Sequence, residues 1–355
     1  MEFKQEDAVK LTEWYEKNHR DLPWRDTGDP YHVWISEIML QQTRIEAVIV
    51  KYQIFVHELP DIASLAAVQD DRLMRLWEGL GYYSRARNLK KCAQVLVKDY
   101  GGKLPENYEE LVRLPGIGPY TAGAVASIAY GKPVPAVDGN VLRILARLFL
   151  TESDIKDPHT KDALQETLTP AYASEQIRAG AFNQGLMELG QLICVPNGAP
   201  RCTECPLAES CLAYRENRTG DIPFRSKPNK RKCEERTLVI VRDEKRFVIR
   251  KRDDAGLLAG LYEFPGIGKH CDPQELRTML ALYIPEIQRL HRLPDAKHIF
   301  SHIEWHMQAY EVLVDDIRSL SLPENCIALT KEEMASAAIP SAFRTYIDYY
   351  RLRSY

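Results

Sequence analysis

A glycine-punctuated turn, Gly116-Ile117-Gly118, constrains this chain more than any other feature, because it opens directly into a run of small residues from Thr121 to Ala129. Glycine permits backbone conformations closed to other residues and leaves room for a neighbouring backbone or phosphate. Pro119 suits the first turn of a helix, where its missing N–H costs little. The exposed N–H groups of such a helix form an anion site, and a nucleic-acid phosphate is the expected anion. An ordinary helix-to-helix turn is the alternative.

The residues on either side of this turn favour the DNA-binding interpretation. Leu114-Pro115 before it and the Thr-Ala-Gly-Ala helix after it resemble a helix-hairpin-helix element. Asp138 lies twenty residues beyond Gly118. In the helix-hairpin-helix DNA glycosylase superfamily, which this stretch resembles, an aspartate at about this offset is the catalytic carboxylate. The resemblance therefore implies that Asp138 is catalytic.

A second carboxylate stands in the string SEIMLQQTR. Residues 21–34 read as a proline-interrupted loop, and Ser36 is expected to cap a helix that runs to Val56, which places Glu37 in its first turn. A glutamate there often does no more than favour the positive end of the helix. The whole string, however, resembles the catalytic-glutamate motif of the MutY-type adenine DNA glycosylases. That resemblance implies that Glu37 protonates the adenine to be removed.

Four of the eight cysteines crowd together at Cys194, Cys202, Cys205 and Cys211, with seven, two and five residues between them. Such clustering favours a metal site over disulfides. The pattern resembles the iron-sulfur loop of the endonuclease III and MutY families, whose usual spacing is six, two and five, and so implies a [4Fe-4S] cluster. The extra residue falls in a Pro/Gly loop that can bulge. Zinc is the alternative, although a zinc ribbon more often has two CxxC pairs.

The family resemblance also assigns DNA and substrate contacts. Tyr82 is expected to wedge into the base stack beside the damaged guanine while Gln42 enters the duplex. Arg25 and Gln184 are expected at the edge of the flipped adenine, and Trp24 in an apolar pocket that raises the pKa of Glu37. The full set of expected DNA or substrate contacts is Arg20, Trp24, Arg25, Gln42, Thr43, Tyr82, Gly116, Gly118, Gln184 and Ser301.

Composition limits how the chain could hold DNA. With 355 residues it is long enough for about two domains. Its net charge is −3 and its pI is near 6.3, which argue against binding by bulk electrostatics. Local patches are required, and residues 225–232, RSKPNKRK, form the best candidate, although a solvated linker explains them equally well. The chain shows neither a long apolar run nor a secretory leader, so a cytoplasmic monomer acting on the nucleoid, without membrane contact, is expected.

The hydrophobic period changes after residue 235. TLVIV at 237–241 and RFVIR at 246–250 predict a β-hairpin, and 303–314 alternates as a strand does, with helices following Asp272 and near the C-terminus. This α+β region resembles the MutT-like (Nudix) fold, but it lacks the glutamate-rich cluster that holds metal for diphosphate hydrolysis. A recognition module for 8-oxoguanine is implied, with Ser301 in a Phe-Ser-His motif.

These features predict a mainly α helix-hairpin-helix glycosylase domain at 1–213, a basic linker at 214–235 and an α+β MutT-like domain at 236–355. The expected reaction is hydrolytic removal of adenine paired with 8-oxoguanine or guanine in double-stranded DNA. Glu37 would act as the acid, Asp138 would stabilise the oxocarbenium ion, and Tyr120 would orient Asp138 or the leaving purine.

Three alternatives to this function differ in chemistry. Endonuclease III carries a nucleophilic lysine in the hairpin turn, where this chain has Tyr120. A catalytically silent iron-sulfur DNA-binding protein would need neither carboxylate. A nucleotide hydrolase would need the glutamate-rich, metal-binding cluster that the second domain lacks.

Overall fold

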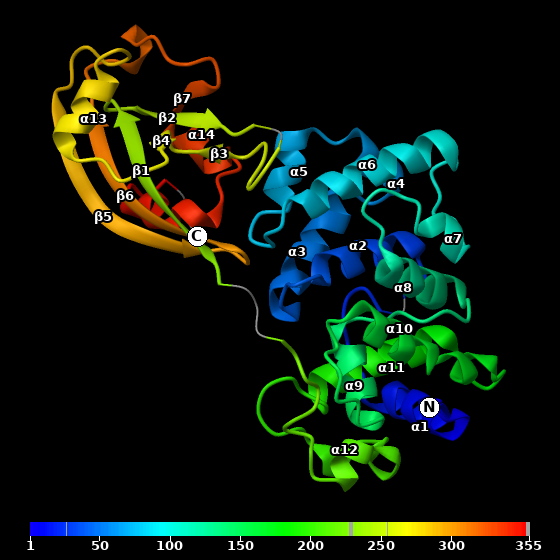
Figure 1. Ribbon diagram of the computed structural model, residues 1–355. Coiled ribbons are helices and arrows are strands. Elements are labelled where there is room, and N and C mark those ends of the chain that lie inside the picture. Colours follow the sequence, from blue (N-terminus) through cyan, green and yellow to red (C-terminus); the bar gives the residue numbers. More distant parts are fainter. Residues whose placement is uncertain (26, 227–229, 254, 353–355) are drawn as a thin grey trace. The chain divides into compact units, whose positions relative to one another are not determined.

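The protein is described by a computed structural model that covers residues 1–25, 27–226, 230–253 and 255–352. The chain divides into two compact units (Figure 1). The first comprises residues 1–68 and 87–227, and the second comprises residues 69–86 and 228–355. The two are described separately below. No helix within the described ranges combines the length and the apolar character needed to cross a membrane.

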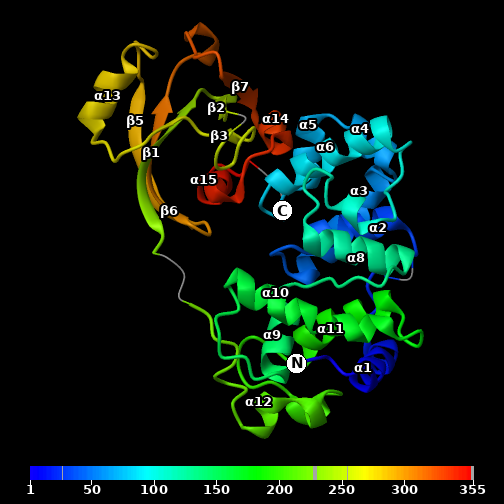
Figure 2. The ribbon, with the colours of Figure 1, turned by 45° about the vertical axis from the view of Figure 1, so that its right-hand side comes forward.

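The first unit is helical, as the sequence predicts. Its helices are α1 (Gln5–Asn18), α2 (Pro30–Leu40), α3 (Ile45–Glu58), α4 (Ile62–Ala67), most of α6 (Ser84–Asp99), α7 (Tyr108–Leu111), α8 (Pro119–Tyr130), α9 (Gly139–Leu148), α10 (Pro158–Glu166), α11 (Ala179–Leu192) and α12 (Leu212–Arg215). Short 3₁₀ turns occupy Thr169–Ala173, Cys202–Glu204 and Ala208–Ser210. Helix α11 packs against α1, α8 and α9, so it runs through the centre of this unit (Figure 2).

The sequence prediction is wrong about where α2 begins. It treats residues 21–34 as a loop, yet the helix starts at Pro30 because Asp29 accepts a hydrogen bond from the backbone N–H of Tyr31 and Pro30 suits the first turn. The helix ends at Leu40, and α3 is separate from it. Glu37 therefore lies in the last turns of α2, near its partially negative end, and not in its first turn.

Two glycines, one in the turn before α8 and one within α8, stand where a larger residue would not fit. Gly116 has a φ of +76°, and a Cβ there would lie 2.5 Å from the Cβ of Asn88. A Cβ on Gly123 would lie 2.1 Å from the carbonyl oxygen of Pro135. The loop that leads to Asp138 therefore lies directly on α8. Gly118 differs from the expectation, because its φ of −90° is open to any residue and the space around it is free.

The second unit is a mixed sheet with helices on both faces. Its strands are β1 (Lys232–Arg242), β2 (Arg246–Lys251), β3 (Tyr262–Glu263), β4 (Gly266–Ile267), β5 (Arg289–Ile299), β6 (Ile303–Leu313) and β7 (Cys326–Thr330). The order is β3-β2-β1-β6-β5, with β4 beside β1 and β7 beside β2. The predicted hairpin is confirmed as β1 and β2, whereas β1 and β6 run parallel. Strand β1 begins inside the segment expected to be a linker.

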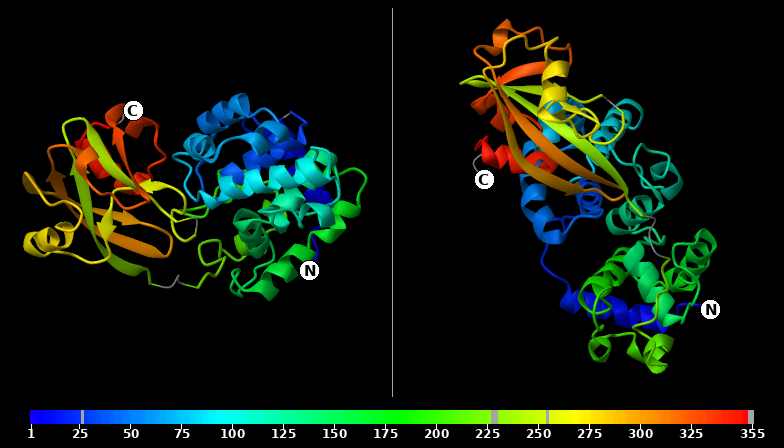
Figure 3. Two further views of the ribbon diagram at one scale, coloured as in Figure 1. Left: turned by 90° about the horizontal axis from the view of Figure 1, so that it is seen from above. Right: turned by 60° about the vertical axis from the view of Figure 1, so that its left-hand side comes forward.

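Two apolar layers fill this unit, one on each side of the sheet (Figure 3). Helix α13 (Pro273–Leu280) buries Leu276 against one face beside Val239 and Tyr310. Helices α14 (Lys331–Ser336) and α15 (Arg344–Tyr349) cover the other face. Helix α5 (Asp70–Leu76) belongs to this unit as well, and Arg75 on it donates to the carbonyl of Ala335.

Candidate active site

A cavity of about 1050 Å³ opens in the first unit between α2, α8 and α11. Eleven residues singled out from the sequence line it, drawn from five separate stretches of chain: Arg20, Trp24, Arg25, Glu37, Gln42, Thr43, Gly116, Gly118, Tyr120, Asp138 and Gln184. The fold thus gathers both expected catalytic carboxylates around one space. This volume lies at the upper end of the range for small-molecule sites, which is about 300–1,000 Å³, and is large enough for a nucleobase.

Glu37 is the buried acid of this cavity. Its residue is 6% exposed, and its Oε2 accepts a 2.6 Å hydrogen bond from the hydroxyl of Tyr120. The pKa of Glu37 is raised to about 7: burial is the largest cause and the charge of Asp138 adds to it, while the Tyr120 hydrogen bond and the charge of Arg25 act in the opposite direction. A substantial fraction of Glu37 is therefore protonated at neutral pH. This matches the sequence expectation that an apolar setting would raise its pKa.

Tyr120 is positioned by the start of α8, where it is the second helical residue. Its hydroxyl donates to Glu37 and lies 3.5 Å from the sulfur of Met187. Burial raises the pKa of Tyr120 well above its ordinary value, with the charges of Glu37 and Asp138 adding to the effect. The phenol thus stays protonated and can donate. Tyr120 is expected to orient Asp138 or the leaving purine, and in the structure its hydroxyl is bonded to Glu37.

Asp138 is the N-cap of α9. Its Oδ1 accepts from the backbone N–H groups of Asn140 and Val141, each at 2.8 Å, and its Oδ2 accepts from the side-chain amide of Asn140 at 2.7 Å. Helix N-termini favour negative charge, and the three amide donors fix the orientation of the carboxylate. The side chain is half-buried and lines the cavity. The two carboxylates therefore occupy opposite environments, one apolar and one rich in donors.

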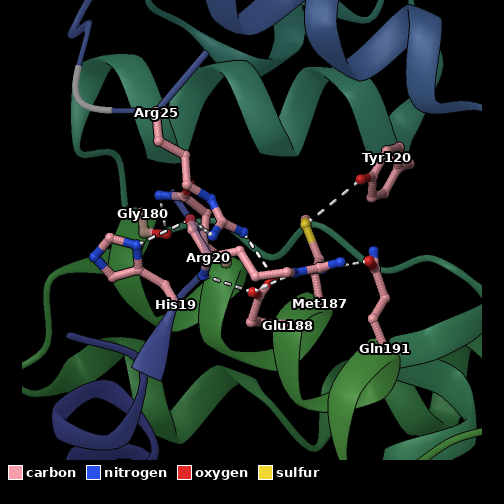
Figure 4. A network of polar contacts seen from close by, with 9 residues as sticks. His19, Arg20, Arg25, Tyr120, Gly180, Met187, Glu188 and Gln191 are labelled. Carbon is pink, nitrogen blue, oxygen red and sulfur yellow. Dashed lines mark hydrogen bonds and ion pairs between the residues drawn. The ribbon is translucent and has the colours of Figure 1, made fainter. Parts of the chain in front are cut away.

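A third carboxylate, Glu188, was missed by the sequence analysis. Its side chain is 1% exposed and anchors two arginines (Figure 4). Arg20 donates to both of its oxygens at 2.8 and 2.9 Å, and Arg25 donates to Oε2 at 2.7 Å. Burial opposes ionisation, but hydrogen bonds from Arg20 and then Arg25 outweigh it and lower the pKa of Glu188 to about 2.

This network gives Arg25 a role within the protein in addition to the expected contact with adenine. Its Nη1 donates to the carbonyl of Arg20 at 2.7 Å, and its guanidinium lies 5.4 Å from the ring centre of Tyr15. Arg20 also donates to the side chain of Gln191 at 2.6 Å. Both cations are therefore held in place before any substrate arrives. The only signal for Glu188 in the sequence is that it is a charged residue on the otherwise apolar face of the 179–192 helix.

The remaining cavity residues lie on its rim or floor. Trp24 is buried, with its ring 5.4 Å from that of Tyr52 in an edge-on contact. Gln42 is exposed and has a φ of +55°, which is uncommon for a residue other than glycine. The side-chain amide of Gln184 donates to the carbonyl of Gly180, one turn earlier in its own helix, at 3.3 Å.

Comparison with known proteins identifies the family. Residues 35–170 match the family of HhH-GPD superfamily base excision DNA repair proteins, and residues 236–349 match the NUDIX domain. The chain is 34% identical to the adenine DNA glycosylase of Mus musculus, over 96% of this chain and 77% of the mouse protein. It is 35% identical to that of Buchnera aphidicola subsp. Acyrthosiphon pisum, over 83% of each chain. The chain belongs to the adenine DNA glycosylase family.

Solved structures support the fold of this glycosylase. A thermostable thymine-DNA glycosylase is 30% identical, with a TM-score of 0.53, and covers 59% of this chain and 95% of its own. An endonuclease III bound to DNA shares the fold with a TM-score of 0.51 at 23% identity, covering 61% of this chain and 98% of its own. The protein is thus an enzyme, a hydrolase of N-glycosidic bonds, and its predicted helical and NUDIX-like fold classes are confirmed.

Three of the four clustered cysteines of the glycosylase, Cys194, Cys205 and Cys211, pack against the core of the first unit. Burial raises the pKa values of Cys202, Cys205 and Cys211, and the nearby thiol of Cys194 raises each of them further. Arg147 donates to the sulfur of Cys194 at 3.2 Å.

Two predicted residues of the glycosylase lie in its second unit. Tyr82 has a φ of +46° and is 45% exposed, and the guanidinium of Arg85 lies 5.6 Å from its ring centre. The hydroxyl of Ser301 is exposed and lies 3.2 Å from Nδ1 of His302. Of the predicted basic stretch at 225–232, residues 227–229 fall outside the described ranges, and the rest is exposed.

Proposed function

We propose that this glycosylase removes adenine paired with 8-oxoguanine or guanine in double-stranded DNA and leaves an abasic site. The observation that carries the proposal is the buried Glu37 carboxyl, bonded to Tyr120 and facing a base-sized cavity. The similarity to the adenine DNA glycosylases of Mus musculus and Buchnera supports adenine as the base that is removed. Its action on DNA would take place at the nucleoid, by a monomer.

Protonation of adenine is the first step. A neutral purine leaves poorly, and a carboxyl with a pKa of about 7 can donate its proton near neutral pH without holding it too tightly. The hydroxyl of Tyr120 fixes one oxygen of Glu37, so the other oxygen is free to face the base. Trp24 and Met187 line the same cavity and exclude water from the acid.

Stabilisation of the sugar is the second step. As the bond to C1′ breaks, the sugar acquires positive charge, which an ionised Asp138 stabilises electrostatically or traps covalently. Its hydrogen bonds to the N-terminus of α9 hold the carboxylate in one orientation. Water then completes the hydrolysis. The pairing of one protonated and one ionised carboxylate resembles the division of labour in glycoside hydrolysis.

The absence of an amine from the cavity argues for a glycosylase without lyase activity. No lysine is found among the described residues that line it. The hairpin position that carries the nucleophile in lyases holds Tyr120, whose pKa is raised by burial. A Schiff base to the sugar therefore has no donor of the usual kind.

Recognition of the opposite base is assigned to Tyr82, Gln42 and Ser301. Tyr82 and Gln42 both have positive φ, a conformation that costs energy and that tends to persist at functional positions. An exposed aromatic side chain can replace the stacking that a flipped base gives up. Ser301 offers a hydroxyl that can donate or accept at the edge of 8-oxoguanine.

Cys194, Cys202, Cys205 and Cys211 would hold a [4Fe-4S] cluster. Four thiolates are the usual ligand set of such a cluster. Zinc is the alternative, but a zinc ribbon more often has two CxxC pairs, and this loop has one, formed by Cys202 and Cys205. When bound, such a cluster would tie the loop to the core and supply redox-active iron. Cys202→Ser should lower iron and sulfide content together, whereas Cys326→Ser, outside the loop, should leave both unchanged.

Single-turnover release of adenine tests the proposed reaction. The substrate is a labelled duplex with adenine opposite 8-oxoguanine, scored with and without alkali, and a matched duplex with adenine opposite thymine is the control. We expect strand cleavage only after alkali and only at the 8-oxoguanine pair. Tight binding without release would point to a silent DNA-binding protein, and cleavage without alkali would point to a lyase.

A further inference from the structure

A second group of metal-ligating side chains lies in the sheet of the second unit, apart from the glycosylase chemistry. Cys233 stands on β1, and Glu304 and His306 stand on β6. One ligand atom from each of the three lies within 4.8 Å of the other two. None of these residues lines the cavity around Glu37.

The register of the two strands explains why these side chains meet. Strands β1 and β6 run parallel, with Cys233 opposite Glu304 and Glu235 opposite His306. Side chains alternate between the two faces of a strand, and directly paired residues share a face. Cys233, Glu304 and His306 therefore project from one face of the sheet.

That face changes character along its length. Beyond Thr237 it carries the buried Val239 and Val241 of the apolar layer under α13. Toward the start of β1 the cover ends, Cys233 is exposed, and Glu304 and His306 are half-buried. A hollow of about 780 Å³ lies there, lined in part by Cys233, Glu235 and His306. A metal ion and its water would have room in it.

The donor atoms are those that zinc takes in proteins. A thiolate, an imidazole and a carboxylate all bind Zn²⁺ at ~2.0 to 2.3 Å, and zinc sites with three protein ligands keep water in the fourth position. A mixed sulfur, nitrogen and oxygen set is too soft for magnesium or calcium, which prefer oxygen alone.

We propose that Cys233, Glu304 and His306 bind a zinc ion that ties the beginning of β1 to β6. Water would complete the coordination. This site is distinct from metal binding of the diphosphate-hydrolase kind, since α13 carries only one carboxylate, Glu275. It goes beyond base excision and does not depend on it.

Lys297 makes the proposal sharper because it competes with the metal. Its ammonium lies 2.5 Å from Oε1 of Glu304, the same oxygen that His306 contacts at 2.6 Å. The Lys297 side chain is 53% exposed and can turn into solvent. A zinc ion bound to Glu304 would compete with this ammonium for the carboxylate. Removing the ammonium should therefore tighten zinc binding, whereas removing a ligand should weaken it.

Zinc affinity of the full-length, cluster-loaded protein tests the site. Zinc would be titrated against a chromophoric chelator for the wild type, Cys233→Ser, His306→Ala and Lys297→Met. We expect Cys233→Ser and His306→Ala to weaken binding by about tenfold or more, since loss of even an outer-shell partner costs 10–100-fold. Lys297→Met should bind more tightly than wild type. Cys326→Ser and His291→Ala, which alter the same unit outside the triad, should match wild type.

Alkylation of individual cysteines provides a readout that does not depend on stoichiometry. Iodoacetamide labelling of the full chain, followed by peptide mass spectrometry, gives a rate for each thiol. Zinc should slow labelling of Cys233 and leave the rate at Cys326 unchanged, and His306→Ala should abolish the protection. Equal zinc affinity in wild type and Cys233→Ser, or labelling of Cys233 that zinc does not slow, would overturn the proposal.

Discussion

The hydroxyl of Tyr120 lies 2.6 Å from Oε2 of Glu37, so the phenol that stands in the hairpin turn is bonded to the acid on α2. The two residues are 83 positions apart in sequence. The hydrogen bond favours the ionised form of Glu37, while burial favours the neutral form more strongly. The acid strength of Glu37 is thus a balance, and each side of that balance can be altered by mutation.

Tyr120→Phe should shift the pH profile of adenine release. The hydrogen bond from Tyr120 lowers the pKa of Glu37, so its loss should raise that pKa above about 7 and move the alkaline fall in rate to higher pH. Single-turnover rates between pH 6 and pH 9 would show the shift, with wild type falling above about pH 7. An alkaline limb at the same pH in both proteins would contradict it.

Glu37→Gln should abolish excision and yet stabilise the fold at alkaline pH. The folded pKa of about 7 exceeds the ordinary 4.5, so the folded state binds the extra proton and loses stability as pH rises from about 4.5 to 7. The penalty above that window is about 3 kcal/mol. Glutamine cannot ionise, so the gain in melting temperature over wild type should be larger at pH 8 than at pH 5. An equal effect at both pH values would show that Glu37 ionises normally.

Glu188→Gln should destabilise the first unit at neutral pH, because Arg20 and Arg25 would lose their buried anion. The folded pKa of about 2 lies below the ordinary 4.5, so the stabilisation is present above pH 4.5 and lost as pH falls toward 2. Its size is on the order of 3 kcal/mol. Chemical denaturation at pH 7 and pH 3.5 would measure it, and the gap between variant and wild type should narrow at the lower pH. Glu209→Gln, whose carboxylate pairs with Lys10 at the surface, is the control and should change little.

Gly123→Ala should impair catalysis through the loop that leads to Asp138. The new Cβ would lie 2.1 Å from the carbonyl of Pro135, so either the loop or α8 must move. Overpacking of this kind costs about 1–3 kcal/mol. We expect lower stability and a lower single-turnover rate with DNA affinity little changed. Gly220→Ala, at a position with open space, should behave as wild type.

The sequence predicts best where local chemistry and tertiary packing agree. The start of α8 is marked by glycine and proline, and the structure begins the helix at Pro119. The β1–β2 hairpin follows from short apolar runs around a charged turn. In contrast, the sequence does not predict β5. Only one of its eleven residues is fully buried, so its apolar residues do not alternate with polar ones as they do in a half-buried strand.

Two errors had different physical causes. The Asp29-Pro30 pair resembles a loop in sequence, although these residues cap and begin α2. The predicted helix therefore starts too late, and Glu37 is wrongly expected in its first turn. Glu188 was missed because its partners Arg20 and Arg25 stand 168 and 163 positions away. These ion pairs form only when α11 packs beside residues 20–25, so no local sequence pattern indicates them.

Asp138 serves both as the N-cap of α9 and as a wall of the cavity, and this double use has a genetic consequence. Asparagine accepts the same backbone hydrogen bonds at an N-cap as aspartate does. One base change in an aspartate codon yields asparagine, so a single mutation should produce a protein that folds and binds DNA without releasing a base.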